Sequence, residues 1–243
     1  MGNFRLLGEP FLAGLLVSVR NATEAQAALA GGADIIDVKE PFAGSLGSAT
    51  PQIWQEIADR IGDKKPLSAA LGELADWDGR VPPEPFRYVK WGLSGLRGNI
   101  LRERLAAAFF DVCETSLIPV AVAYADFENA GCPRPLEILE LAAGMGASVL
   151  LIDTFVKDGR GLLDFCDLDA IATLRYRSAG MGMALALAGS LNRSTMETLS
   201  PFGPDWFAVR GAVCSGLRTG NVDEQLVAEL ARFVNPLEAS GAD

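Results

Sequence analysis

Lysine is scarce in this sequence, and three of its five lysines occupy similar places. Lys39, Lys90 and Lys157 lie at or just beyond the C-terminal ends of short apolar runs. A lysine that is shielded from water near other amines has a lowered pKa. Its free amine can then attack a carbonyl carbon and form a Schiff base. The three positions therefore predict carbonyl chemistry. The alternative is that each lysine only extends from a strand end into solvent.

Aspartates accompany two of these lysines. Asp37 precedes Lys39 by two residues, so both side chains point to the same face of an extended strand. Asp153 precedes Lys157 by four residues, which places it where it could move protons while Lys157 pairs with a phosphate or activates a carbonyl. The alternative for both aspartates is a structural salt bridge with the neighbouring lysine.

Two glycine-containing strand ends predict a phosphate site. Gly189 and Ser190 follow one apolar run, and Arg210 and Gly211 end the next. Glycine allows the backbone to approach a phosphate closely, and arginine can donate two parallel hydrogen bonds to it. The glycines could equally be tight turns. A further glycine-rich loop at 43–47 could bind a second phosphate, cover the site or be a flexible connection.

These residues belong to a repeating pattern of apolar runs and helical stretches. Each run is rich in Val, Ile and Leu and is nearly continuous, as expected of strands covered on both faces. Helices are predicted at 22–30, 51–61, 100–114, 135–144 and 169–177, after Ser194, and at 223–233. The eight predicted strands are 15–19, 34–39, 67–71, 88–93, 117–124, 148–154, 183–188 and 206–210.

Eight strand–helix units in one chain predict a single-domain (β/α)8 TIM barrel over residues 1–243, with a frayed tail at 236–243. In that fold the chemistry lies at the C-terminal ends of the strands, so the three lysines would share one mouth. The alternative is a doubly wound open sheet. It is disfavoured because no Gly-x-Gly-x-x-Gly follows the first run and the sequence has no P-loop motif.

Composition excludes several classes of function. The formal net charge of −10 argues against a nucleic-acid partner. Histidine is absent, which removes imidazole as a base or metal ligand, and the four cysteines are far apart, so we expect no metal site. No apolar run is long enough to cross a membrane. The cysteine spacing favours reduced thiols, and we expect a cytoplasmic protein.

Five segments resemble one known family, the (5-formylfuran-3-yl)methyl phosphate synthases of methanofuran biosynthesis. The resemblance covers most of the chain, and its most specific parts are the Asp-x-Lys and Asp-Thr-x-x-Lys-Asp-Gly patterns. The segments are LLVS at 15–18, GGADIIDVK at 31–39, GSLG at 44–47, VKWGL at 89–93 and LIDTFVKDG at 151–159.

The resemblance implies a (β/α)8 barrel that joins two molecules of glyceraldehyde 3-phosphate into a phosphorylated furan aldehyde, with loss of phosphate and water. It also implies that no organic or metal cofactor is required. The active-site lysines and aspartates of the family match Asp37, Lys39, Lys90, Asp153 and Lys157.

On this basis Lys39 is predicted to be the Schiff-base nucleophile, although the division of roles between Lys39 and Lys157 stays open. Lys90 would depress the pKa of Lys39 and bind phosphate, and Asp37 would orient Lys39. Asp153 and Lys157 would transfer protons. Ser18, in the first of the five segments, joins the substrate-binding candidates.

Two other functions fit the same residues. One is a Schiff-base aldolase that acts on another sugar phosphate, and the other is a barrel that binds a phosphorylated metabolite without turnover. The expected partner in each case is a small phosphorylated molecule. A homo-oligomer is also possible, because barrels often associate through their outer helices.

Overall fold

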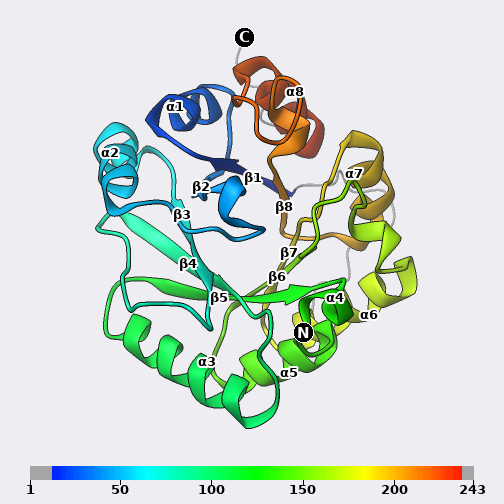
Figure 1. The fold of residues 1–243 in the computed structure, drawn as a ribbon. Coiled ribbons are helices and arrows are strands. Elements are labelled where there is room, and N and C mark those ends of the chain that lie inside the picture. Colours follow the sequence, from blue (N-terminus) through cyan, green and yellow to red (C-terminus); the bar gives the residue numbers. More distant parts are fainter. Residues whose placement is uncertain (1–12, 237–243) are drawn as a thin grey trace.

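Eight parallel strands pair in chain order and close into a barrel, with β1 contacting both β2 and β8. The computed structural model describes residues 13–236, and Figure 1 shows the strands at the centre with helices around them. The predicted (β/α)8 fold is confirmed, and the open sheet is wrong. The strands are β1 (Gly14–Val19), β2 (Ile35–Val38), β3 (Leu67–Glu73), β4 (Phe86–Gly92), β5 (Ile118–Tyr124), β6 (Val149–Asp153), β7 (Ala184–Leu187) and β8 (Trp206–Val209).

The helices begin where the sequence offers capping residues. Thr50 accepts a hydrogen bond from the Ile53 amide, and Pro51 occupies the first turn, so this helix has its predicted bounds. Residues from 237 onward in the predicted tail lie outside the described residues. The helices are α1 (Ala22–Ala30), α2 (Pro51–Ile61), α3 (Gly98–Cys113), α4 (Phe127–Ala130), α5 (Pro135–Gly144), α6 (Leu168–Gly180), α7 (Arg193–Leu199) and α8 (Glu224–Val234).

Side-chain alternation along the strands decides which residues enter the barrel. In β4, Trp91 packs outward against Phe109 of α3, with ring centroids 6.4 Å apart, so its neighbour Lys90 points inward. The strand register aligns Ser18 with Asp37 and Asp37 with Ser68 across β1, β2 and β3. The upper interior of the barrel therefore contains a polar layer, which we define as Ser18, Asp37, Ser68 and Lys90.

Apolar side chains fill the barrel below the polar layer. They include Leu16, Ile35, Val120 and Leu151, which border a small cavity of about 30 Å³ beneath Lys90. A second hydrophobic zone lies between the outer strand faces and the helices, where Ile57, Ile138 and Val227 are fully buried. Within residues 13–236 no helix has the length and apolar character that a membrane span needs.

Candidate active site

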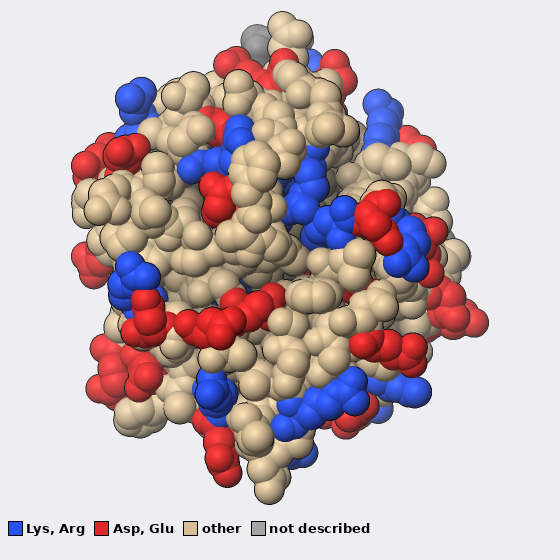
Figure 2. Space-filling model, in the orientation of Figure 1, with Lys and Arg blue, Asp and Glu red and all other residues tan. Residues whose placement is uncertain are grey.

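A cavity of about 300 Å³ lies at the C-terminal end of the barrel. The space-filling view shows Lys and Arg side chains bordering a hollow near the middle of this face (Figure 2). All ten residues that the sequence singled out line this one cavity: Ser18, Asp37, Lys39, Lys90, Asp153, Lys157, Gly189, Ser190, Arg210 and Gly211.

Lys90 and Asp37 form a buried ion pair at the bottom of the cavity. Lys90 Nζ also donates to Ser68 Oγ at 2.9 Å, and Ser18 Oγ donates to Asp37 Oδ2 at 3.0 Å. Burial opposes ionisation of Asp37, but the charges of Lys90 and Lys39 lower the pKa of this carboxyl below its ordinary value. Asp37 is thus bonded to Lys90 and Ser18, and in the described chain its interaction with Lys39 is one of charge and not a hydrogen bond.

A second ion pair joins Asp153 and Lys157. Lys157 Nζ lies 2.8 Å from Asp153 Oδ1 and 3.0 Å from Thr154 Oγ1, and the Thr154 amide donates to Asp153 Oδ1 at 2.7 Å. Burial again opposes ionisation, yet the charges of Lys157 and Lys39 lower the pKa of Asp153. Asp153 is therefore a carboxylate at neutral pH, with Lys157 held beside it.

Lys39 lies between these two pairs and is the amine suited to attack a carbonyl. It directly follows β2 and is 9% exposed. Its backbone amide donates to the Val19 carbonyl at 3.0 Å, but its side chain makes no hydrogen bond or ion pair with any residue from 13 to 236. Burial lowers the pKa of Lys39 to about 8; the charges of Lys157 and Lys90 act in the same direction, while Asp153 and Asp37 oppose them. A free amine is thus accessible near neutral pH.

The segment after β2 crosses the mouth of the barrel (Figure 1). Ser45 Oγ lies 2.8 Å from the Thr154 carbonyl oxygen and 3.2 Å from Asp153 Oδ2, so the loop at 43–47 reaches from β2 to β6. Gly47 is packed against this loop so closely that an added Cβ would lie 2.2 Å from the Glu40 carbonyl oxygen. The loop is therefore ordered around the site and covers part of it.

Three residues that line the cavity after β7 and β8 have backbone N–H groups that are unpaired within residues 13–236. In the described chain the amides of Gly189, Ser190 and Gly211 donate no hydrogen bond to protein. Ser190 has φ +51°, and it is the single non-glycine residue with positive φ between residues 13 and 236. Such backbone outliers cluster at ligand sites, and unpaired amides suit an anion.

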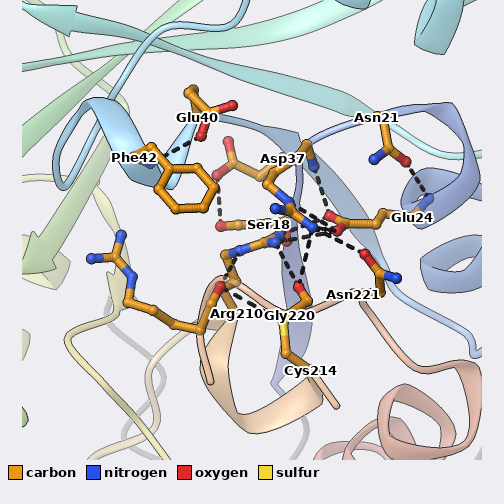
Figure 3. A network of polar contacts seen from close by, with 12 residues as sticks. Ser18, Asn21, Glu24, Asp37, Glu40, Phe42, Arg210, Cys214, Gly220 and Asn221 are labelled. Carbon is orange, nitrogen blue, oxygen red and sulfur yellow. Dashed lines mark hydrogen bonds and ion pairs between the residues drawn. The ribbon is translucent and has the colours of Figure 1, made fainter. Parts of the chain in front are cut away.

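Arg210 does not offer its guanidinium to the cavity. Its Nη1 donates to Glu24 Oε2 at 2.9 Å and to the Ser18 carbonyl at 2.9 Å, and its Nη2 donates to Glu24 Oε1 and the Gly220 carbonyl. Its Nε donates to the Arg218 carbonyl at 2.7 Å. Figure 3 shows this buried network. All five N–H donors are used, so the predicted phosphate bond from Arg210 is wrong.

Two functional positions were missed by the sequence reasoning. Arg218 lines the cavity from the loop between β8 and α8. A signal existed, because Gly216 and Gly220 flank it in a loop that follows a barrel strand. Asp126 is buried after β5 and accepts the amides of Phe155 at 2.6 Å and Val156 at 2.9 Å, which fixes the loop that carries Lys157. No local pattern marks Asp126, since its partners are 29 and 30 residues away.

Comparison with solved structures shows the same fold in proteins of very different sequence. Thiamine phosphate pyrophosphorylase from Pyrococcus furiosus superposes with a TM-score of 0.60 at 16% identity, over 92% of this chain and 97% of that chain. N-(5'-phosphoribosyl)anthranilate isomerase from Pyrococcus furiosus gives a TM-score of 0.61 at 15% identity, over 93% and 100%. These identities are evidence for a shared barrel alone.

Sequence comparison is more specific. The family model described as 4-HFC-P synthase matches residues 15–231. The chain is 34% identical over 234 residues to the (5-formylfuran-3-yl)methyl phosphate synthase of Methanothermobacter thermautotrophicus (strain Delta H), which covers 91% of this chain and 98% of that protein. It is 35% identical over 231 residues to the protein of the same name from Methanococcus maripaludis (strain S2), over 90% and 98%. The resemblance seen in the sequence is confirmed, and the chain belongs to the 4-HFC-P synthase family.

Proposed function

We propose that this chain condenses two molecules of glyceraldehyde 3-phosphate into (5-formylfuran-3-yl)methyl phosphate, with loss of phosphate and water, through a Schiff base on Lys39. The reaction would be that of a carbon–oxygen lyase acting on phosphates, in methanofuran-type biosynthesis. The observation that carries the proposal is a buried amine with a pKa of about 8, unpaired within residues 13–236 and lying among two Asp–Lys pairs. The names of the relatives supply the product.

The chemistry follows from the position of Lys39. Its free amine adds to the aldehyde carbon of one triose phosphate, and loss of water gives an iminium ion. The iminium withdraws electrons, so the proton on the adjacent carbon becomes acidic and a carboxylate can remove it. The resulting enamine can expel phosphate from the next carbon or add to the aldehyde of the second triose phosphate. Dehydration then closes the aromatic furan, and hydrolysis of the iminium bond releases the product and returns the free amine of Lys39.

Asp153 and Lys157 are placed to exchange these protons. Asp153 is ionised and can accept the proton, while Lys157, 2.8 Å away, can donate one to a departing oxygen. Of the two roles inferred for Lys90 from the sequence, we keep the lowering of the Lys39 pKa and not the phosphate bond, since Lys90 is bonded to Asp37 and Ser68 at the bottom of the cavity. We assign Lys90 to keeping Asp37 ionised and to lowering the pKa of Lys39 through its charge.

A phosphate group would bind at the unpaired amides of Gly189, Ser190 and Gly211. Fixed N–H dipoles suit a phosphate dianion, and the glycine backbones let it approach closely. A phosphate bound there would hold the substrate in the cavity that also contains Lys39. The amine and the substrate carbonyl would then react within one oriented complex and not by random encounter.

Borohydride trapping tests the covalent step. The protein is incubated with glyceraldehyde 3-phosphate and sodium borohydride, and the modified peptide is mapped by mass spectrometry. We expect the reduced adduct on Lys39, no adduct in Lys39→Ala, and full labelling in the matched control Lys65→Ala, because Lys65 pairs with Asp34 away from the cavity. An adduct on Lys157 would overturn the assignment to Lys39, and a complete absence of adduct during turnover would exclude the covalent mechanism.

Product analysis separates the synthase from the alternative aldolase. The proposed reaction releases one inorganic phosphate for each furan formed, whereas a simple aldol addition retains both phosphates. We therefore expect inorganic phosphate and furan to accumulate in equal amounts. A product that retains both phosphates would support the aldolase instead.

A further inference from the structure

Arg218 is a half-buried cation with unused hydrogen-bond donors beside the cavity. Its Nη2 lies 3.4 Å from the carbonyl oxygens of Pro41 and Gly44, at the long limit for a hydrogen bond. Its Nε and Nη1 donate to no group in the part of the chain that the structure describes. Three of its five N–H donors are therefore free, in contrast to Arg210, whose five are all engaged.

The backbone that carries Arg218 is fixed although its guanidinium is not. Arg210 donates from Nε to the Arg218 carbonyl at 2.7 Å and from Nη2 to the Gly220 carbonyl at 3.1 Å. Gly220 has no room for a side chain, since an added Cβ would lie 2.2 Å from the Ser215 carbonyl oxygen. Glu24 holds Arg210 in place from α1 (Figure 3). The buried network thus presents Arg218 to the cavity from a rigid base.

Charge pairing leaves Arg218 and Lys39 without a carboxylate partner among the cations that line the cavity in the described chain. Lys90 is paired with Asp37, Lys157 with Asp153, and Arg210 with Glu24. In the described chain Arg218 forms no ion pair, and burial lowers the pKa of its guanidinium below the ordinary value. A half-buried guanidinium without a carboxylate partner at a cavity wall is suited to an anionic ligand, above all to phosphate.

Arg218 and the amides after β7 approach the cavity from different sides. Gly189 and Ser190 follow β7, whereas the guanidinium of Arg218 contacts the segment that follows β2. Gly211 lies beside the backbone of Arg218, where an added Cβ would be 3.5 Å from Arg218 Cβ, but the guanidinium extends from there to Pro41 and Gly44. Two strands, β8 and β1, separate β7 from β2 around the barrel. The two groups nevertheless line the same cavity, and Lys39 lies beside it at the end of β2.

We propose that Arg218 binds a phosphate group at a second subsite, distinct from the Gly189–Ser190 amides, so that the cavity holds two phosphoryl groups at once. The identity of the second ligand rests on the proposed function, because the second phosphate group would be that of the second triose phosphate. The subsite itself depends only on the free donors and on the separation of the two groups around the barrel. It also explains why the segment at 41–44 directs two carbonyl oxygens at Arg218: they hold the guanidinium until an anion replaces them.

Phosphate binding tests the subsite without any need for turnover. Isothermal titration of the full chain with inorganic phosphate should give two sites in the wild type and one in Arg218→Ala. Removal of the guanidinium should weaken phosphate binding at the second site about tenfold to a hundredfold, the loss typical of hydrogen bonds to a charged group. The second site is then either undetected or measurably weaker in Arg218→Ala. Arg218→Lys keeps the charge without the paired donors and should give an intermediate affinity.

Arg97→Ala is the matched control, because Arg97 also donates to a loop carbonyl, that of Gly131 at 2.8 Å, but does not line the cavity. It should retain both sites. Thermal unfolding of each variant checks that it is folded, and little change is expected for Arg218→Ala because the side chain makes only long contacts. A single site in the wild type, or two unchanged sites in Arg218→Ala, would overturn the proposal. Failure of furan synthesis with two intact phosphate sites would instead count against the proposed function alone.

Discussion

The lowered pKa of Lys39 predicts how fast this chain forms an imine at each pH. Burial places the pKa at about 8, compared with 10.5 for an ordinary lysine. At pH 7.5 about a quarter of the Lys39 side chains would then be free amines, compared with about 0.1% of ordinary lysines, an advantage of roughly two hundredfold. Because only the free amine attacks, the rate of imine formation should rise with pH and level off above about pH 8.

Two substitutions should move this profile in opposite directions. The positive charge of Lys157 lowers the pKa of Lys39, so Lys157→Met should raise it and shift the profile to higher pH. The negative charge of Asp153 raises the pKa of Lys39, so Asp153→Asn should shift the profile to lower pH. Both variants are measured by borohydride trapping, because proton transfer in later steps does not enter that readout.

The assay follows the initial rate of adduct formation on the Lys39 peptide between pH 6 and 10. Lys65→Ala is the control, since Lys65 lies outside the cavity and its removal should leave the midpoint unchanged. A midpoint near 10.5 in the wild type would refute the lowered pKa. Shifts of the same sign in the two variants would refute the electrostatic account even if the midpoint were correct.

Three further predictions concern stability. Glu24→Gln removes a buried carboxylate that two arginines bind, and it should lower the free energy of unfolding in urea by about 3 kcal/mol at pH 7. Burial opposes ionisation of Glu24, but hydrogen bonds from these arginines lower its pKa below the ordinary value of 4.5. The stabilisation by the Glu24 carboxylate is therefore present above pH 4.5 and should disappear as the pH falls through the lowered pKa. Lys90→Met leaves Asp37 buried without its ion-pair partner and should destabilise the chain by about 3 kcal/mol, whereas adding Asp37→Asn should recover most of that loss in the same urea assay. Gly189→Ala places a side chain on a residue with φ +95° and puts its Cβ 3.0 Å from a neighbouring methyl carbon. It should lower the free energy of unfolding by about 2 kcal/mol. The control Gly203→Ala should cost less, because nothing lies within 4 Å of the added Cβ.

The sequence predicted those features that local residues determine. The strands follow from continuous apolar runs, and α2 has its predicted bounds because Thr50 and Pro51 are adjacent to the first turn. The cavity residues came together because the C-terminal ends of parallel strands share one rim. These inferences need only the order of elements along the chain.

The pairing of charges could not be predicted in the same way. Asp37 and Lys39 are neighbours in sequence, but residues two apart on a strand are separated by about 6.6 Å along it. Lys90, which is 53 residues away, extends its side chain through the barrel interior and contacts Asp37 directly. Arg210 meets Glu24 across 186 residues. Long-range packing therefore decides which cations are free, and this is why Arg218 escaped notice.

The polar layer of the barrel lowers the thermal stability of the fold and is needed for its chemistry. Barrel interiors of this type are usually filled with branched aliphatic side chains, and replacing a buried ion pair by apolar residues of similar volume often stabilises a protein by about 1–4 kcal/mol. Replacing Asp37 and Lys90 together by such residues would therefore give a more stable barrel whose interior lacks this ion pair. Laboratory evolution that selects for thermal stability alone should therefore favour loss of the Asp37–Lys90 pair. Selection for furan formation in every round would retain it.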